Sequence, residues 1–167
     1  MTVAIYPGSF DPITCGHLDI IDRASRLYER LVVAVAVDTN KHHHFPLPVR
    51  MQLIQQTVSS WPNVGVASFE GLTVAFAQQC QAQVIIRGLR AVSDFEFECS
   101  MSQMNKSLAP NVETVFMMAG TEYQFLSSSM VKEVCRLGGD VSSLVRLPVL
   151  QALKASFGSL TDQSGVS

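Results

Sequence analysis

Short apolar runs alternate with stretches of helical periodicity along most of this chain. The apolar runs have the length of strands and cover residues 3–6, 31–37, 64–67, 84–86 and 114–118. Between them, apolar residues recur at helical spacing, as Ile21, Ala24 and Tyr28 do, which predicts helices over residues 16–28, 49–60, 72–80, 92–108, 127–137 and 148–157. The pattern is therefore a strand followed by a helix, repeated along the chain.

This repetition predicts a five-stranded parallel sheet flanked by helices, in a single Rossmann-like α/β domain over residues 1–157. The strands are nearly continuous Val, Ile and Leu, which is typical of strands that are buried on both faces. In such folds ligands bind at the carboxyl ends of the strands, where the strand order reverses. The polar stretch 158–167 is predicted to be a disordered tail.

Composition and charge narrow the classes of function that are open to this chain. The chain of 167 residues is 47% hydrophobic and 16% charged, which is ordinary for a globular domain and leaves room for an oligomer interface. A net charge of -2 argues against a general nucleic-acid binder but permits a local basic site for a small anion. The longest apolar run, residues 31–37, is too short to span a bilayer, so no membrane partner is expected.

The cysteines indicate a reducing compartment. Cys15, Cys80, Cys99 and Cys135 are widely spaced and form no zinc or CxxC pattern. We interpret them as reduced thiols in a cytoplasmic protein. Cys15 lies inside the opening motif, where a small neutral spacer is favoured over a reactive thiol.

The stretch "IYPGSFDPITCGHLDII", residues 5–21, predicts a strand-to-helix turn that receives phosphate. Gly8 lets a ligand approach the backbone, and Ser9 and Phe10 offer backbone N–H groups and a hydroxyl. Thr14 is suited to cap the following helix. Free N–H groups and the helix dipole at such a start attract anions.

His17 falls in the first turn of that helix. It shares a face with Ile21 and Ala24, which points it inward over the edge of the sheet. There it is placed to donate a hydrogen bond to a phosphate oxygen. The alternative is a core histidine without a chemical role.

Two further stretches suggest anion binding. Arg87 is predicted to end a buried strand, where a charge is unexpected unless an anion lies nearby. Pairing of Arg87 and Arg90 with Asp94, Glu96 or Glu98 is the structural alternative. Three serines, residues 127–129, precede a helix and offer hydroxyl and N–H groups for phosphates.

Three motifs together resemble one family. "GSFDPITCGH" contains the T-x-G-H signature of the nucleotidyltransferase superfamily, and "IIRGLRAVSDFEFE" (85–98) and "FLSSSMVKEV" (125–134) resemble motifs of the phosphopantetheine adenylyltransferases. The resemblance runs from about residue 3 to about residue 155. It implies the nucleotidyltransferase version of the Rossmann-like domain.

The resemblance also implies a reaction, in which ATP and 4'-phosphopantetheine give dephospho-CoA and pyrophosphate. The acceptor phosphate would attack in line, with no covalent intermediate and no general base. Mg²⁺ would be held mainly by ATP phosphates and water rather than by protein ligands. The family further implies a homohexamer and feedback inhibition by coenzyme A.

Residue roles follow from the same resemblance. His17 corresponds to the transition-state stabiliser, with Lys41 and Arg90 as further catalytic residues. The positions that correspond to ATP contacts are Ser9, Phe10, His17, Gly88, Leu89, Arg90, Tyr123, Gln124, Phe125, Leu126, Ser127, Ser128 and Ser129. The positions that correspond to acceptor contacts are Ser9, Lys41, Thr73, Arg87 and Glu98.

The chain departs from the motifs in places. The superfamily pattern S-S-T-x-x-R has Ser129 and Lys132 here, and lysine keeps the charge but loses the bidentate fork. The histidines 42–44 replace a Lys/Pro-rich sequence. Three consecutive side chains do not converge on one ion, so a solvated mobile loop is preferred to a metal site. Asp11 is expected to serve the turn itself.

Two other functions stay open. Another small-molecule nucleotidyltransferase, specific for nicotinamide mononucleotide or a cytidylyl acceptor, shares the opening motif, but "RGLRAVSDFEFE" argues against it. A nucleotide-binding module without turnover would be expected to lose His17, Lys41 or the arginines, and all are present.

Overall fold

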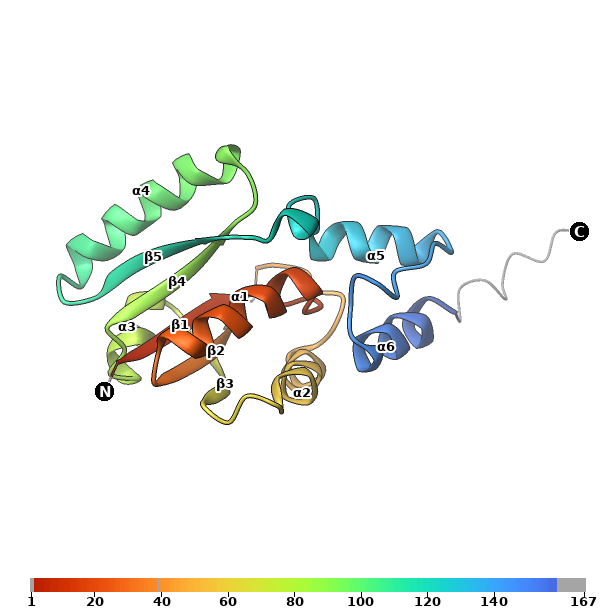
Figure 1. Cartoon of the computed structure of the whole chain (residues 1–167), viewed down its shortest axis with the longest axis horizontal. Coiled ribbons are helices and arrows are strands. Elements are labelled where there is room, and N and C mark those ends of the chain that lie inside the picture. Colours follow the sequence, from red (N-terminus) through yellow and green to blue (C-terminus); the bar gives the residue numbers. More distant parts are fainter. Residues whose placement is uncertain (1, 39, 159–167) are drawn as a thin grey trace, which may run out of the picture.

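Five parallel strands in the order β3-β2-β1-β4-β5 form the central sheet of the computed structural model (Figure 1). The structure describes residues 2–38 and 40–158. The strands are β1 (Val3–Gly8), β2 (Arg30–Val37), β3 (Val64–Glu70), β4 (Val84–Leu89) and β5 (Glu113–Met118). The chain builds outward from β1 to β3 and then returns to place β4 on the other side of β1. The strand order therefore reverses between β1 and β4, where ligands bind in such sheets.

Helices cover both faces of this sheet. They are α1 (Cys15–Leu27), α2 (Leu47–Val58), α3 (Thr73–Gln79), α4 (Val92–Leu108), α5 (Ser128–Arg136) and α6 (Leu147–Gly158), with a 3₁₀ turn η1 (Thr121–Tyr123) after β5. Helices α3 and α4 pack on one face, and α1 and α2 pack on the other. Helices α5 and α6 lie together beyond the end of the sheet, and α6 contacts α2 (Figure 1).

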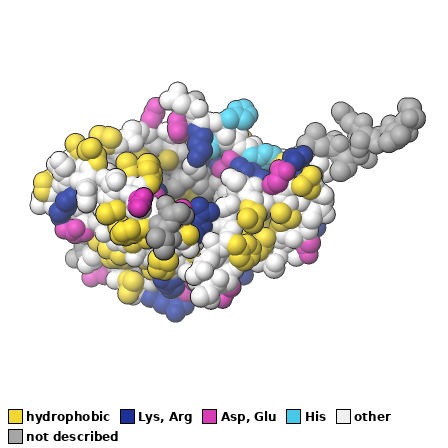
Figure 2. Space-filling view, turned by 90° about the horizontal axis from the view of Figure 1, so that it is seen from above, with side chains coloured by type: hydrophobic (Ala, Val, Ile, Leu, Met, Phe, Trp, Pro, Cys, Tyr) yellow, Lys and Arg dark blue, Asp and Glu magenta, His cyan; other side chains and the backbone are white. Residues whose placement is uncertain are grey.

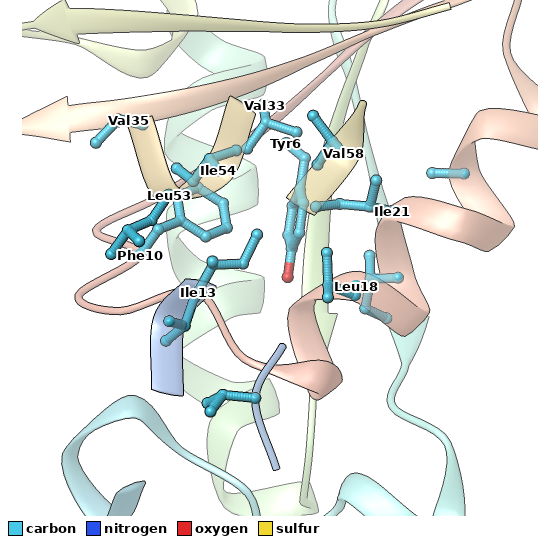
Figure 3. Close-up of a cluster of buried hydrophobic side chains, with 14 of the residues drawn as sticks. Tyr6, Phe10, Ile13, Leu18, Ile21, Val33, Val35, Leu53, Ile54 and Val58 are labelled. Carbon is cyan, nitrogen blue, oxygen red and sulfur yellow. The ribbon is translucent and has the colours of Figure 1, made fainter. Parts of the chain in front are cut away.

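Successive residues of each strand point to opposite faces of the sheet and pack into two different cores, which explains the continuous apolar runs. In β1, Val3 and Ile5 pack with α3, whereas Ala4 and Tyr6 face α1 and α2. Figure 3 shows the second of these cores, in which Tyr6 and Phe10 lie among side chains of β2, α1 and α2.

The predicted fold class is confirmed: a five-stranded parallel sheet flanked by helices. The predicted end of β4 is wrong, since Arg87, Gly88 and Leu89 continue the strand and pair with residues 116–118 of β5. Strand β1 likewise continues through Gly8, and η1 was not predicted. Apart from Gly158, which ends α6, the predicted tail 158–167 lies outside the described residues. Across 2–38 and 40–158, no helix is long and apolar enough to cross a membrane.

Candidate active site

A cavity of about 380 Å³ opens at the carboxyl ends of β1 and β4, at the point where the strand order reverses. Side chains from the turn after β1, the end of β4, α4 and the start of α5 surround it. Figure 2 shows hydrophobic side chains gathered on the left part of this face, the side on which α4 lies in Figure 1. The cavity is lined by Tyr6, Pro7, Gly8, Phe10, His17, Arg87, Gly88, Arg90, Asp94, Phe97, Glu98, Leu126, Ser127 and Ser128.

The turn after β1 has a shape that requires glycine at one position. Phe10 has a left-handed backbone (φ 47°), and its buried ring folds back toward the strand. A Cβ atom on Gly8 would lie 3.0 Å from this ring, closer than side chains normally approach. The Phe10 ring also makes edge contacts with Tyr6 and with His17, at centroid distances of 5.4 and 5.0 Å. The turn thus presents backbone to the cavity and supports the imidazole of His17.

His17 is held in one tautomer. The backbone N–H of Thr14, just before α1, donates to His17 Nδ1 (3.0 Å), and the Thr14 hydroxyl lies 3.1 Å from the same nitrogen. With Nδ1 accepting, the proton of the neutral ring resides on Nε2. Burial, assisted by the positive charge of Arg90, lowers the pKa of His17 to about 4. His17 therefore enters the cavity as a neutral hydrogen-bond donor at neutral pH.

Arg87 lies within β4 and is fixed by a bidentate ion pair. Its Nε and Nη2 donate to Glu98 Oε2 and Oε1 at 2.7 and 2.6 Å, and Nη1 donates to the carbonyl of Pro7 at 3.2 Å. The hydrogen bonds to Glu98 raise the pKa of Arg87, so it is charged throughout the working range. The ion pair expected as the structural alternative is present, yet both partners still line the cavity.

Gly88 and Arg90 follow on the same strand end. A Cβ on Gly88 would approach the Tyr6 hydroxyl to 3.3 Å, so the close packing of β4 against Tyr6 favours glycine at this position. Arg90 is exposed, and its Nε lies 3.5 Å from Asp94 Oδ2. Leu89, also predicted to contact ATP, is buried and does not line the cavity.

Two smaller pockets adjoin the cavity on opposite sides. One of about 90 Å³ lies toward α1 and η1 and shares Tyr6, His17, Gly88, Arg90 and Leu126 with the cavity. It adds Thr14, Gly16, Ile20, Ala119 and Tyr123. Of the predicted ATP contacts in residues 123–126, the structure brings Tyr123 and Leu126 here, whereas Gln124 and Phe125 are exposed and lie outside this pocket.

The other pocket, of about 130 Å³, lies toward α3 and α4. It shares Pro7, Arg87, Phe97 and Glu98 with the cavity. It adds Thr73, Ile85, Met101, Ser102, Asn105 and Thr114. Three of the predicted acceptor contacts, Thr73, Arg87 and Glu98, are thereby brought together from three separate elements.

The three consecutive serines do not act as one group. Ser127 caps α5 by accepting from the N–H of Met130 (3.1 Å), and the Ser128 hydroxyl donates to the carbonyl of Pro12 (2.7 Å). Both line the cavity. Ser129 instead faces a hollow of about 430 Å³ on the other side of α5, with Lys132 and the histidine run.

Two predicted contacts lie outside the cavity lining. Ser9 sits between two lining residues, but what it contributes in the structure is its carbonyl, which accepts from Arg50 at 2.7 Å. Lys41 is exposed on the loop after β2. Neither residue is thereby shown to touch a ligand.

The prediction of a solvated mobile loop is wrong for two of the histidines. The His43 side chain is 11% exposed and lies 3.8 Å from Asp11. His44 Nε2 lies 2.6 Å from the Ser156 hydroxyl, and its ring stacks on Phe157 at 4.6 Å. The partner of His43 comes from the turn after β1 and the partners of His44 come from α6, and neither could be foreseen from the local sequence. Among the residues described, no group of three His, Cys, Asp or Glu could hold a metal ion.

Sequence reasoning missed Arg50, a buried arginine on α2. It donates to the carbonyls of Ser9 (2.7 Å) and Phe45 (3.1 Å) and so joins the turn to the loop before α2. A signal was present, because Arg50 shares the apolar face of its helix with Leu53 and Ile54. An arginine on a buried face needs acceptors, and carbonyls of the turn supply them.

The strand order that reverses at the cavity and the neutral histidine at the start of α1 are arranged as in the nucleotidyltransferase class. The family model described as cytidylyltransferase-like matches residues 5–134. Curated relatives agree on a narrower group within that class.

Several relatives are named phosphopantetheine adenylyltransferase. That of Clostridium kluyveri is 57% identical over 145 residues, which is 87% of this chain and 88% of the relative. That of Heliobacterium modesticaldum is 52% identical over 158 residues (95% and 94%), and that of Alkaliphilus metalliredigens is 53% identical over 153 residues (92% and 98%). The chain belongs to the phosphopantetheine adenylyltransferase family.

Solved structures of lower identity support the fold. A putative nicotinate-nucleotide adenylyltransferase from Vibrio parahaemolyticus has a TM-score of 0.70 at 17% identity, covering 93% of both chains. A Plasmodium falciparum nicotinic acid mononucleotide adenylyltransferase complexed with NaAD has a TM-score of 0.68 at 14% identity, covering 94% of this chain and 96% of its own.

Proposed function

We propose that the protein transfers the adenylyl group of ATP to 4'-phosphopantetheine, giving dephospho-CoA and pyrophosphate. The observation that carries this proposal is one cavity that contains two arginines and has a pocket on each side, in a chain about half identical to enzymes of that name. The two pockets meet at a central cavity that contains His17, Arg87 and Arg90. Two anionic substrates entering from opposite sides would bring their phosphates together there.

ATP is assigned to the side of α1 and η1. The pocket next to Gly16 and Tyr123 is small and partly apolar, which suits a nucleobase. From there the triphosphate would extend past Arg90 toward Ser127 and Ser128 at the start of α5. Arginine charge and helix N–H groups favour phosphate oxygens.

The acceptor is assigned to the side of α3 and α4. Its pantetheine arm would occupy the pocket with Thr73, Met101 and Asn105, which offers both apolar and hydrogen-bonding groups. Its phosphate would lie near Arg87. Because Glu98 already holds Arg87 in place, the free face of the guanidinium is preorganised toward the cavity.

The chemistry then requires alignment more than proton transfer. A phosphate oxygen of the acceptor attacks the α-phosphorus of ATP, and the bond from that phosphorus to the oxygen of the departing pyrophosphate breaks. The acceptor phosphate is already an anion, so no base is needed. His17 Nε2–H donates to the phosphoryl oxygens most strongly when charge develops in the transition state, and the positioned arginines neutralise that charge.

Mg²⁺ is proposed to arrive with ATP. The two carboxylates of the cavity, Asp94 and Glu98, are both engaged with arginines, so the lining fits an ion coordinated by phosphates and water better than one held by the protein. Such an ion would neutralise phosphate charge.

The wider family properties are also proposals for this chain. Helix α4 exposes apolar side chains, among them Phe97 (68%) and Met104 (58%), which supports assembly into a homohexamer by covering them. Coenzyme A contains the same pantetheine arm as the acceptor, so we propose that it competes for that pocket and inhibits by feedback. The four free cysteines support a cytoplasmic location.

Pyrophosphate release tests the proposed function directly. The protein is incubated with ATP and Mg²⁺ and with either 4'-phosphopantetheine or nicotinamide mononucleotide. Release only with phosphopantetheine supports the enzyme and its acceptor pocket together. Release with the mononucleotide would transfer the assignment to another nucleotidyltransferase, and ATP binding without release would indicate a binding module.

A further inference from the structure

Asp11 is a buried carboxylate that joins three segments of the chain. It is 6% exposed and lies in the turn after β1. Its Oδ2 accepts from the backbone N–H of His44 (2.8 Å) and from Lys132 Nζ (3.0 Å), and its Oδ1 accepts from the N–H of Phe45 (2.9 Å). Burial alone would raise the pKa of Asp11, but these hydrogen bonds hold it below its ordinary value.

The three segments are the turn itself, the loop that follows β2, and helix α5. Other contacts strengthen the same junction. Ser128 at the start of α5 donates to the carbonyl of Pro12, and Arg50 ties the turn to the loop through the carbonyls of Ser9 and Phe45. Asp11 is the point at which all three segments meet.

Each of these segments carries a group that either lines the cavity or corresponds to a substrate contact of the family. The turn carries the backbone at Phe10, the loop carries Lys41, and the start of α5 carries Ser127 and Ser128. Asp11 is not among the residues that line the cavity, so it has no direct route to a substrate. Its position relates the segments to each other rather than to a ligand.

We propose that Asp11 is a positioning residue for adenylyl transfer. Its carboxylate fixes the turn, the loop after Lys41 and the start of α5 in one arrangement, so that the acceptor phosphate and the triphosphate of ATP meet in line. This inference rests on the proposed function. Misalignment of reacting groups by about 1 Å costs on the order of 100-fold in rate, so a junction of this kind affects turnover more than binding.

The chemistry of the junction requires a carboxylate. Asp11 receives three donors: two backbone N–H groups and an ammonium. An asparagine of the same shape has one acceptor oxygen, and its amide hydrogens would face at least one of these donors. One segment would therefore have to move away, and Lys132 would lose its counter-charge.

The test compares Asp11→Asn with variants of its partner. Lys132→Met removes the charge, Lys132→Arg preserves it, and Asp11→Asn/Lys132→Met removes the whole ion pair. Glu133→Gln is the matched control, because it breaks an ion pair with Arg136 on the exposed side of the same helix. For each protein, calorimetry with ATP gives the fraction of competent sites and the Kd, and pyrophosphate release gives kcat per competent site.

We expect Asp11→Asn to lower kcat per competent site by about 10- to 100-fold, while the Kd for ATP changes by less than about threefold. Lys132→Arg should retain more activity than Lys132→Met, and the double variant should be no slower than Asp11→Asn, because the two residues act as a unit. Glu133→Gln should behave like the wild type. If Asp11→Asn does not fold, the difference in kcat between Lys132→Met and Lys132→Arg shows whether the ion pair supports turnover.

A kcat per competent site within about twofold of the wild type, with only a lower Tm, would show that Asp11 is merely structural and would overturn the inference. Equal losses for Lys132→Arg and Lys132→Met, or strictly additive losses in the double variant, would also overturn it. A wild-type protein that binds ATP but releases no pyrophosphate would instead overturn the proposed function, and the positioning role with it.

Discussion

Replacing His17 by alanine removes a hydrogen-bond donor from the centre of the cavity, together with the acceptor of the Thr14 N–H and the ring that packs on Phe10. The ring is fixed by the N–H of Thr14 on Nδ1, so the lost donor is Nε2–H. A preorganised donor of this kind is worth about 100- to 1,000-fold in kcat, or roughly 3–4 kcal/mol. The contact strengthens only as charge develops, so the Kd for ATP should change by less than about threefold.

The pH dependence gives a second, independent readout. Because the pKa of His17 is lowered to about 4, the ring is neutral from about pH 5.5 upward and should produce no inflection in kcat between about pH 5.5 and 9. The shift from the ordinary value of 6.5 corresponds to about 3 kcal/mol. The unfolded chain binds this proton more readily, so the stabilisation is complete above pH 6.5 and is lost as the pH falls toward 4.

The assay is single-turnover pyrophosphate release with calorimetric binding of ATP, for the wild type, His17→Ala and His17→Gln. Denaturation at about pH 7 and about pH 5 should show a smaller loss of stability on acidification for His17→Gln than for the wild type. Equal losses of ATP affinity and rate would mean that His17 stabilises bound ATP and the transition state equally. A wild-type inflection near the ordinary histidine pKa of 6.5 that His17→Gln abolishes would refute the neutral-donor mechanism.

Three further changes test other parts of the structure. Arg87→Ala should raise the KM for the acceptor by about tenfold or more in steady-state kinetics, as expected for the loss of a charged hydrogen bond, and should leave the KM for ATP within about twofold of the wild type. A defect confined to the KM for ATP would assign Arg87 to the other pocket. Gly8→Ala places a methyl group 3.0 Å from the Phe10 ring and should lower both kcat and the free energy of unfolding, the latter by about 1–3 kcal/mol in chemical denaturation. Gly65→Ala is the control, because no atom lies within 4 Å of its added methyl group, and it should change both quantities little. Equal effects of the two substitutions would contradict the packing argument. Ile21→Ala in the core should lower the free energy of unfolding by about 2–5 kcal/mol in urea titrations. Leu27→Ala, at an exposed position, should leave this free energy nearly unchanged. Similar losses of stability for the two variants would show that this core is loosely packed.

The errors of sequence interpretation have physical causes. The predicted end of β4 was too early because Arg87 interrupts the apolar run, although Glu98 on α4 supplies the counter-charge that lets an arginine stay in the strand. The sequence favours a solvated loop for the histidines because three consecutive side chains do not converge on one ion. Their actual partners, Asp11 and Ser156, come from the turn after β1 and from α6, both far away along the chain.

Most of the elements, the fold class and the family could be predicted from the sequence. Apolar periodicity depends on each residue's near neighbours, and the motifs around His17, Arg87 and Ser127 are contiguous, so both are readable along the chain. The tertiary structure alone decided which motif residues meet. It placed Ser128 in the cavity and Ser129 on the other side of α5, fixed the tautomer and pKa of His17, and made Asp11 a junction. These properties depend on burial and on partners brought from distant segments, which no local pattern specifies.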